Sequence, residues 1–279
     1  MAAELRFSSH PNDVKKYTTQ ELRDHYLIQD LFQLDVIKMV YSMHDRMVTM
    51  GCLASEDGIS LPAFEDYTKA EFFLERREMG IINVGGAGKV TVDDEEFSLE
   101  KKECLYIGKG QKEILFSSDS GSNPAAFYIC SCPAHHSYPT TKASLDQANR
   151  VELGSSTNSN ERTIFQFIHE DGIASCQLVM GFTELAPGNV WNTFPPHTHN
   201  RRMEMYFYFD VPEDQLVMHF MGQADETRHI AMRNREAVIS PEWSIHSGAG
   251  TSAYSFIWSM AGENKAFTDM DGIGITEIK

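Results

Sequence analysis

Hydrophobic residues in this chain recur in short runs, many of them alternating with polar residues, and glycine, proline, aspartate and asparagine separate the runs. One series occupies residues 80–86, 88–92, 96–99, 104–108, 113–116 and 126–130, and a second extends from Thr163 to near Met260. Side chains alternate along a strand with period two, and short strands at this spacing are typical of antiparallel sandwiches and barrels. The pattern therefore predicts an all-β protein.

Only a few helices are expected. Thr18-Thr-Gln-Glu21 forms a capping box, which predicts a short helix through Leu27. We interpret this helix as part of an N-terminal arm that packs on a neighbour. Residues 141–149 favour a second helical segment, and the small polar residues at 154–160 are typical of a linker or an exposed loop. We therefore predict two domains, residues 1–150 with the arm and residues 151–279.

Candidate chemistry is concentrated in the second half. His197 and His199 are one residue apart, so an extended strand places both imidazoles on the same face. On a continuous strand the Glu204 side chain would point to the opposite face, because side chains alternate. A turn after His199 would return its carboxylate to the imidazoles. His246 offers a fourth donor, on a strand that opens after a proline turn beginning at Pro241. Three imidazoles and a carboxylate suit a divalent transition ion with positions left for water or substrate.

The two halves look like one structural unit used twice. Setting the arginine pair at 76–77 against the pair at 201–202 places a non-ligand or a lone carboxylate opposite each candidate ligand. The residues in these places are Phe72, Leu74, Met79 and Glu113, opposite His197, His199, Glu204 and His246. Only the second domain is therefore expected to hold metal. The first domain would be structural or would support oligomerisation.

Several neighbours of the candidate ligands could contact a ligand. Arg201 and Arg202 would supply a local cationic pocket for a carboxylate, or else form a solvated hairpin tip, and both interpretations stay open. Tyr206 and Tyr208 share a strand face with Glu204, so either hydroxyl could enter the cavity or either ring could pack in the core. We favour the cavity for Tyr206 and leave both interpretations open for Tyr208.

Charge and cysteine content exclude some partners. The formal net charge of −16 argues against nucleic acid and anionic membrane surfaces. No apolar run approaches transmembrane length, and the first residues lack the features of a signal peptide. The five cysteines are scattered and odd in number, which indicates reduced thiols rather than a disulfide framework. We expect a cytoplasmic protein with no nucleic-acid or membrane partner.

The spacing His-x-His, four residues, Glu, and a distant Pro-x-x-x-x-His resembles the metal-binding motifs of the cupin superfamily. A closer resemblance, to the 5-keto-4-deoxyuronate isomerase family of pectin breakdown, covers nearly the whole chain. It rests on residues 72–80, 85–88, 181–193, 197–199, 201–204, 222–230 and 239–248. The resemblance implies two cupin-like, jelly-roll β-barrel domains with a few short helices, and a homo-oligomer, which in this family is a hexamer.

The same resemblance implies a metal-dependent aldose–ketose isomerase. It would convert 5-dehydro-4-deoxy-D-glucuronate, a small acidic sugar, to 3-deoxy-D-glycero-2,5-hexodiulosonate through an enediol. One divalent ion per chain, with zinc as our first choice, would stabilise the developing negative charge. The sequence names no general base. Two alternatives stay open, because the ligand set alone also fits an iron-dependent cupin dioxygenase or a non-catalytic sugar-binding cupin.

Overall fold

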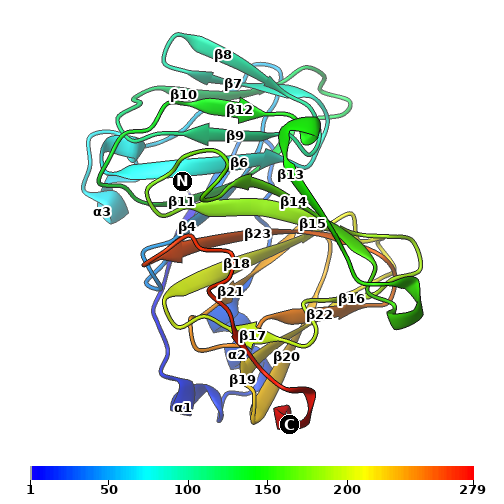
Figure 1. Ribbon diagram of the computed structural model, residues 1–279. Helices are drawn as coiled ribbons and strands as arrows, with labels where there is room; N and C mark the ends of the chain where they lie inside the picture. The colour runs from blue at the N-terminus through cyan, green and yellow to red at the C-terminus, as the bar shows by residue number, and fades with distance from the viewer. Residues whose placement is uncertain (1) are drawn as a thin grey trace. The chain divides into compact units, whose positions relative to one another are not determined.

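A computed structural model describes residues 2–279 (Figure 1). The described residues form two compact units, each built from separate parts of the sequence. The first comprises the chain up to Leu5 with residues 30–148 and 167–179, and the second comprises residues 6–29, 149–166 and 180–279. A single boundary at residue 150 does not describe these units, because each contains a segment from the other side of that boundary.

Two sheets make up the first unit, with strand orders β1-β3-β4-β11-β6-β9-β12 and β5-β10-β7-β8. Their strands are β1 (Ala2–Arg6), β3 (Ile37–Ser42), β4 (Val48–Leu53), β5 (Ile59–Ser60), β6 (Arg77–Asn83), β7 (Gly88–Val92), β8 (Glu95–Leu99), β9 (Cys104–Ile107), β10 (Ile114–Ser118), β11 (Ala126–Pro133) and β12 (Thr141–Ala143). An apolar core of this unit includes Phe116 and Phe127, whose ring centroids are 5.4 Å apart. The alternating pattern of β7 arises because its buried residues face this core.

The second unit repeats this architecture, with strand orders β13-β14-β15-β23-β18-β21-β2 and β16-β22-β19-β20, together with the small pair β17-β24. Its strands are β2 (Leu27–Ile28), β13 (Asn149–Leu153), β14 (Arg162–Ile168), β15 (Val179–Leu185), β16 (Trp191–Asn192), β17 (His197–Thr198), β18 (Arg202–Phe209), β19 (Val217–Gln223), β20 (Glu226–Met232), β21 (Glu236–Ser240), β22 (Ser247–Gly250), β23 (Ser255–Gly262) and β24 (Asp271–Gly272).

Equivalent strands of the two units share their register as well as their order. Met79 of β6 lies opposite Ile107 of β9, and Glu204 of β18 lies opposite Ser240 of β21. Both residues are two positions beyond the arginine that begins the strand. Met79 therefore occupies the place of Glu204, which agrees with the alignment of the halves on their arginine pairs.

Helices are few and short, as the sequence predicts. They are α1 (Pro11–Val14), α2 (Thr19–Tyr26) and α3 (Glu65–Thr68), with 3-10 turns η1 (Phe73–Glu75), η2 (Leu145–Gln147), η3 (Ser156–Asn158) and η4 (Ile275–Glu277). The capping box of α2 is confirmed, with Thr18 and Glu21 bonded reciprocally. The arm packs within its own chain, because β2 directly follows α2 and pairs with β21.

The prediction of a helical segment at residues 141–149 was wrong. Thr141–Ala143 pairs with β9 as a strand, and only the single turn Leu145–Gln147 is helical. Ser144 caps that turn. The three residues before it pair with the backbone of β9 at the edge of the larger sheet instead of continuing a helix. Sheet pairing over a long sequence separation therefore overrides the local preference.

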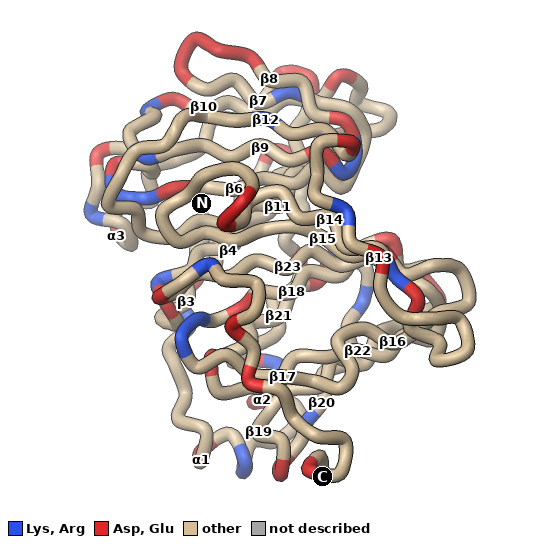
Figure 2. Tube along the Cα trace, viewed as in Figure 1, with Lys and Arg blue, Asp and Glu red and all other residues tan. Residues whose placement is uncertain are grey.

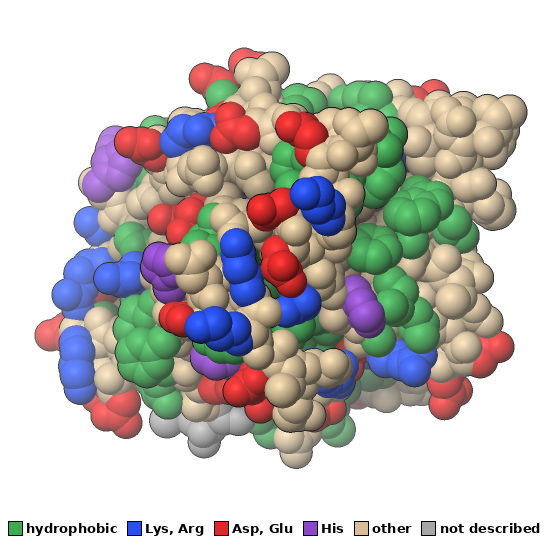
Figure 3. Space-filling model, turned by 90° about the horizontal axis from the view of Figure 1, so that it is seen from below, with side chains coloured by type: hydrophobic (Ala, Val, Ile, Leu, Met, Phe, Trp, Pro, Cys, Tyr) green, Lys and Arg blue, Asp and Glu red, His purple; other side chains and the backbone are tan. Residues whose placement is uncertain are grey.

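Acidic residues are distributed over the chain, with a cluster at the turn between β7 and β8, where Asp93, Asp94, Glu95 and Glu96 follow one another (Figure 2). Lys, Arg, Asp and Glu are intermingled on the face shown in Figure 3. Charge is therefore mixed locally although the net charge is strongly negative. Among the described helices, none has the length and apolar character needed to cross a membrane.

All five cysteines are free thiols. Four of them, Cys52, Cys104, Cys130 and Cys132, are buried, and Cys176 is half-buried. Burial raises the pKa of the Cys132 thiol well above its usual value, with the charge of Glu78 as the next cause. This group is therefore a neutral core residue.

Candidate metal centre

The strands β17 and β18 bring three of the four predicted ligands together. The chain reverses directly after His199, where the Arg202 amide donates to the His199 carbonyl at 3.2 Å. This is the predicted turn that brings the Glu204 carboxylate back to the side of His197 and His199. His246 follows a second tight turn, closed by the Ser244 amide donating to the Pro241 carbonyl at 2.9 Å, and it directly precedes β22.

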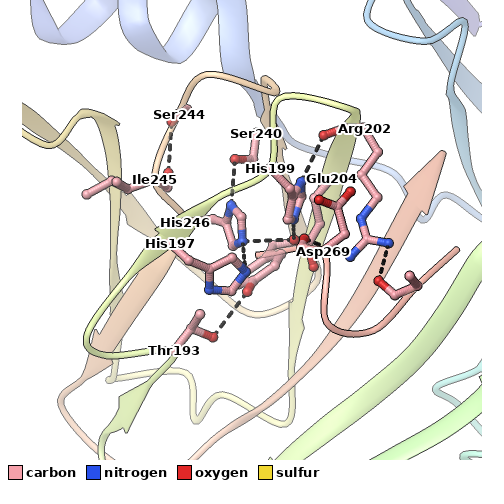
Figure 4. A network of polar contacts seen from close by, with 12 residues as sticks. Thr193, His197, His199, Arg202, Glu204, Ser240, Ser244, Ile245, His246 and Asp269 are labelled. Atoms are coloured by element: carbon pink, nitrogen blue, oxygen red, sulfur yellow. Dashed lines mark hydrogen bonds and ion pairs between the residues drawn. The ribbon is translucent and has the colours of Figure 1, made fainter. Parts of the chain in front are cut away.

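The four donor groups converge on one point (Figure 4). Ligand atoms of His197, His199 and His246 all lie within 4.8 Å of one another. The Nε2 atoms of His197 and His246 are 3.0 Å apart, and Glu204 Oε2 lies 3.2 Å from His199 Nε2 and 3.0 Å from His246 Nε2. The His197, His199 and His246 triad could therefore bind a metal ion, with the Glu204 carboxylate in reach of the same position.

Hydrogen bonds on the far side of two rings aim their Nε2 atoms at this point. His199 Nδ1 donates to the Arg202 carbonyl at 2.9 Å, because a carbonyl can only accept. His246 Nδ1 lies 3.4 Å from Ser240 Oγ. In both rings the contact at Nδ1 leaves the Nε2 atom facing the other donors, which is how proteins orient metal-binding histidines. The donor set and its outer contacts both fit a divalent ion.

Burial keeps two of the imidazoles neutral. It lowers the pKa of His197 to about 4 and that of His246 well below its ordinary value, and in both cases neighbouring histidines add to the effect. Burial also lowers the pKa of His199, but the hydrogen bond and charge of Glu204 outweigh it, so that this pKa is raised. Neutral imidazoles are the ligand form, and an ion would displace the proton of His199.

Three of the four donors, His197, His199 and Glu204, line a cavity of about 350 Å³. Its apolar walls include Phe256, Trp258 and Met260 of β23 and two residues of the C-terminal segment, Phe267 and Met270. Arg202, Tyr206 and Arg162 add polar groups to the lining. A largely apolar pocket with a few convergent polar groups is the usual form of a small-molecule site.

The segment that follows the last long strand, β23, closes one side of the cavity. We call residues 263–273 the C-terminal strap. Its strand β24 pairs with β17, placing Gly272 opposite the candidate ligand His197. No local sequence pattern identified this contact, because it joins segments about seventy residues apart in the chain.

The two arginines next to the ligands both contact this strap. Arg201 donates from Nε to Asp269 at 2.6 Å and from Nη2 to Asp271 at 2.8 Å, and it is absent from the cavity lining. Arg202 is buried, lines the cavity and donates from Nη1 to the Ala266 carbonyl at 2.9 Å. The pair therefore holds the strap against the ligand strand.

The two tyrosines of β18 have different surroundings. Tyr206 lines the cavity, with its hydroxyl 3.2 Å from Thr193 Oγ1. Tyr208 is fully buried and its hydroxyl lies 2.8 Å from His219 Nδ1. Tyr208 therefore belongs to a buried polar network, whereas Tyr206 is placed for contact with a bound molecule.

His219 leads to a prediction about acid stability. Burial lowers its pKa to about 3, whereas an unfolded chain protonates this imidazole below about 6.5. As the pH falls through that window the unfolded state binds an extra proton, so the free energy of unfolding should fall by about 1.4 kcal/mol per pH unit for this group. His219→Gln should reduce the slope by up to that amount, measured by urea unfolding of metal-free protein at several pH values. An unchanged slope would contradict the assignment.

Comparison with known proteins gives the family. A family model described as KduI/IolB matches residues 31–272. The chain belongs to the KduI/IolB family. Over 276 residues it is 51% identical to a protein of Halalkalibacterium halodurans named 4-deoxy-L-threo-5-hexosulose-uronate ketol-isomerase, covering 99% of this chain and 100% of that one. A protein of Bacillus subtilis with the same name is 52% identical over 276 residues, with the same coverage. These matches confirm the resemblance to the 5-keto-4-deoxyuronate isomerase family that the sequence motifs indicated.

Solved structures bear on the fold alone. An IolB-like protein from Salmonella typhimurium matches with a TM-score of 0.64 at 17% identity, covering 79% of this chain and 84% of that one. An oxalate decarboxylase of Bacillus subtilis matches with a TM-score of 0.54 at 9% identity, covering 79% and 70%. The predicted all-β, cupin-like fold is confirmed.

Proposed function

We propose that this chain is a metal-dependent ketol-isomerase that converts 5-dehydro-4-deoxy-D-glucuronate to 3-deoxy-D-glycero-2,5-hexodiulosonate in the breakdown of pectin and related polyuronides. The observation that carries this proposal is the full-length match, 51% identity over 99% of this chain, to a relative named for the reaction. The cavity beside four convergent donors supports it, because this isomerisation needs charge stabilisation and a fixed geometry rather than an electron acceptor.

His197, His199, Glu204 and His246 are the proposed ligands of one divalent ion per chain, and zinc is the first choice because the reaction requires no redox change. When bound, the ion would act as a Lewis acid that stabilises negative charge on the substrate oxygens. The hydrogen bond that His199 Nδ1 donates to the Arg202 carbonyl, and the contact of His246 Nδ1 with Ser240 Oγ, would hold two of the imidazoles in place.

The remaining groups of the cavity would bind and enclose the substrate. Burial raises the pKa of Tyr206, with the charge of Glu204 as the next cause, so its hydroxyl keeps its proton and can donate to a sugar oxygen. Arg202 Nε is buried without a hydrogen-bond partner among the described residues, which makes it a second candidate donor. Arg201 is tied to Asp269 and Asp271, so we assign it to holding the strap that excludes water from one side.

We propose that the first unit is a cupin-like domain without metal. Met79 stands at the place of Glu204, and the one group of three metal-type side chains found in residues 2–279 lies in the second unit. We also propose that the protein is a cytoplasmic homo-oligomer, a hexamer as in the family that the sequence resembles. Size-exclusion chromatography with light scattering would test the hexamer.

An oxygen test separates the isomerase from a cupin dioxygenase, since both can use three histidines and a glutamate. An isomerisation moves a proton between adjacent carbons and passes no electrons to an acceptor. Turnover should therefore proceed without dioxygen, persist with zinc as the sole added ion, and be lost with a chelator. Ketose formation would be followed by NMR, together with dioxygen consumption. Strict dependence on dioxygen, with loss of activity in the zinc form, would overturn the isomerase proposal.

A further inference from the structure

Two arginines line the cavity, and their surroundings differ. Arg202 lies on β18 two residues before Glu204, and its Nη1 donates to the C-terminal strap at the Ala266 carbonyl, 2.9 Å away. Its Nη2 lies 3.4 Å from the Asp269 carbonyl. Most of this guanidinium is therefore committed to contacts within the protein, at the end of the cavity where the proposed ligands lie.

Arg162, at the start of β14, has more of its guanidinium free. Nη1 donates to the Asn160 carbonyl at 2.8 Å, and within residues 2–279 no carboxylate forms an ion pair with Arg162. Burial lowers the pKa of Arg162, and the hydroxyls of Tyr206 and Tyr254 oppose that shift. A partly desolvated cation without an acidic partner is stabilised by binding an anion.

The sheet separates Arg162 from the proposed ligands by a distance that suits a six-carbon sugar acid. The strand order β14-β15-β23-β18 puts Arg162 three strands from Glu204, so the strands that carry the two residues lie about 14 Å apart across the sheet at the usual strand spacing. With carbon–carbon bonds of about 1.5 Å, a six-carbon chain spans roughly 6 Å from end to end. Side chains reaching inward from both strands would take up the remainder.

The orientation of the substrate follows from its own chemistry. The proposed reaction occurs at the aldehyde end of the sugar, and the carboxylate is at the opposite end of the carbon chain. If the reacting carbons lie beside His197, His199 and Glu204, the carboxylate must lie deeper along the wall formed by β23 and β14. The lining of this wall is apolar at Ile164 and Trp258 and cationic at Arg162.

We infer that Arg162 binds the carboxylate of the substrate and selects uronates over neutral sugars. This inference rests on the proposed function, since it assigns the part of the substrate that does not react. A planar guanidinium can bind a carboxylate with two parallel hydrogen bonds, which a neutral hydroxymethyl group cannot reproduce. An overall charge of −16 makes such a local cation necessary for an anionic substrate.

The test compares Arg162→Gln and Arg162→Lys with the unaltered protein. Arg162→Gln should raise KM by about 10–100-fold, the usual loss for a hydrogen bond to a charged group, with a smaller change in kcat. Arg162→Lys, which keeps the charge, should recover part of the loss. Arg150→Gln is the matched control. Arg150 is an exposed arginine on the neighbouring strand β13, and its guanidinium forms an ion pair with Glu152. Metal content should be the same in all four proteins.

Direct binding gives a readout that does not depend on turnover. Calorimetry with D-galacturonate and with its neutral counterpart D-galactose should show a preference for the acid in the unaltered protein and in Arg150→Gln, and none in Arg162→Gln. A preference that survives in Arg162→Gln, or its absence from the unaltered protein, would overturn the role of Arg162. Preference for the acid without any isomerisation by the unaltered protein would instead overturn the proposed function and leave the carboxylate site standing.

Discussion

His246→Ala is expected to remove the bound metal and the isomerase activity together. His197, His199 and Glu204 lie on or between β17 and β18, whereas His246 comes from a separate part of the chain. Its Nε2 lies 3.0 Å from both His197 Nε2 and Glu204 Oε2. Loss of outer contacts alone commonly costs 10–100-fold in metal affinity, so loss of a ligand should cost at least about 100-fold. Metal content by elemental analysis and kcat/KM should fall in parallel.

The fold should persist in this variant, because removal of His246 also relieves the crowding of three imidazoles and a carboxylate. Circular dichroism would check this. His229→Ala is the matched control, since His229 is an exposed histidine on β20 of the same unit. Full metal occupancy in His246→Ala would show that the ion, if any, is bound elsewhere.

Glu78→Ala should destabilise the first unit more than any surface substitution. The carboxylate is fully buried and accepts the backbone amides of Cys176, Gln177 and Leu178 at 2.7, 2.8 and 2.8 Å. It also accepts the hydroxyl of Tyr106 at 2.8 Å. Leaving buried donors without an acceptor costs about 1–3 kcal/mol each, so a total loss of roughly 3 kcal/mol or more is expected.

Denaturant unfolding followed by circular dichroism would measure this loss. The three tryptophans, Trp191, Trp243 and Trp258, all lie in the second unit, so their fluorescence reports that unit separately. Glu78→Gln should be intermediate, because its amide keeps one acceptor but turns a donor toward the backbone amides. Glu95→Ala, at an exposed position on β8, is the control. An unchanged midpoint in Glu78→Ala would mean that water replaces the carboxylate at little cost.

The sequence by itself determined the elements whose signals are local. Alternation along strands such as β7, the reciprocal cap of α2 and the His197, His199 and Glu204 spacing each depend on residues a few positions apart. Backbone geometry converts such spacing directly into a shared face or a tight turn. The fourth donor, His246, was found because its proline turn is also a local pattern.

The tertiary structure alone decided what lies around those elements. Residues 167–179 belong to the first unit, where the Glu78 carboxylate binds backbone amides nearly one hundred residues away. Arg201 pairs with the C-terminal strap, and Arg162 enters the cavity from a strand three places away in the sheet. These contacts leave no periodic trace in the sequence, because a single charged residue has the same local pattern whether it meets solvent, a buried backbone or a substrate. Only the folded sheet fixes which of these partners it meets.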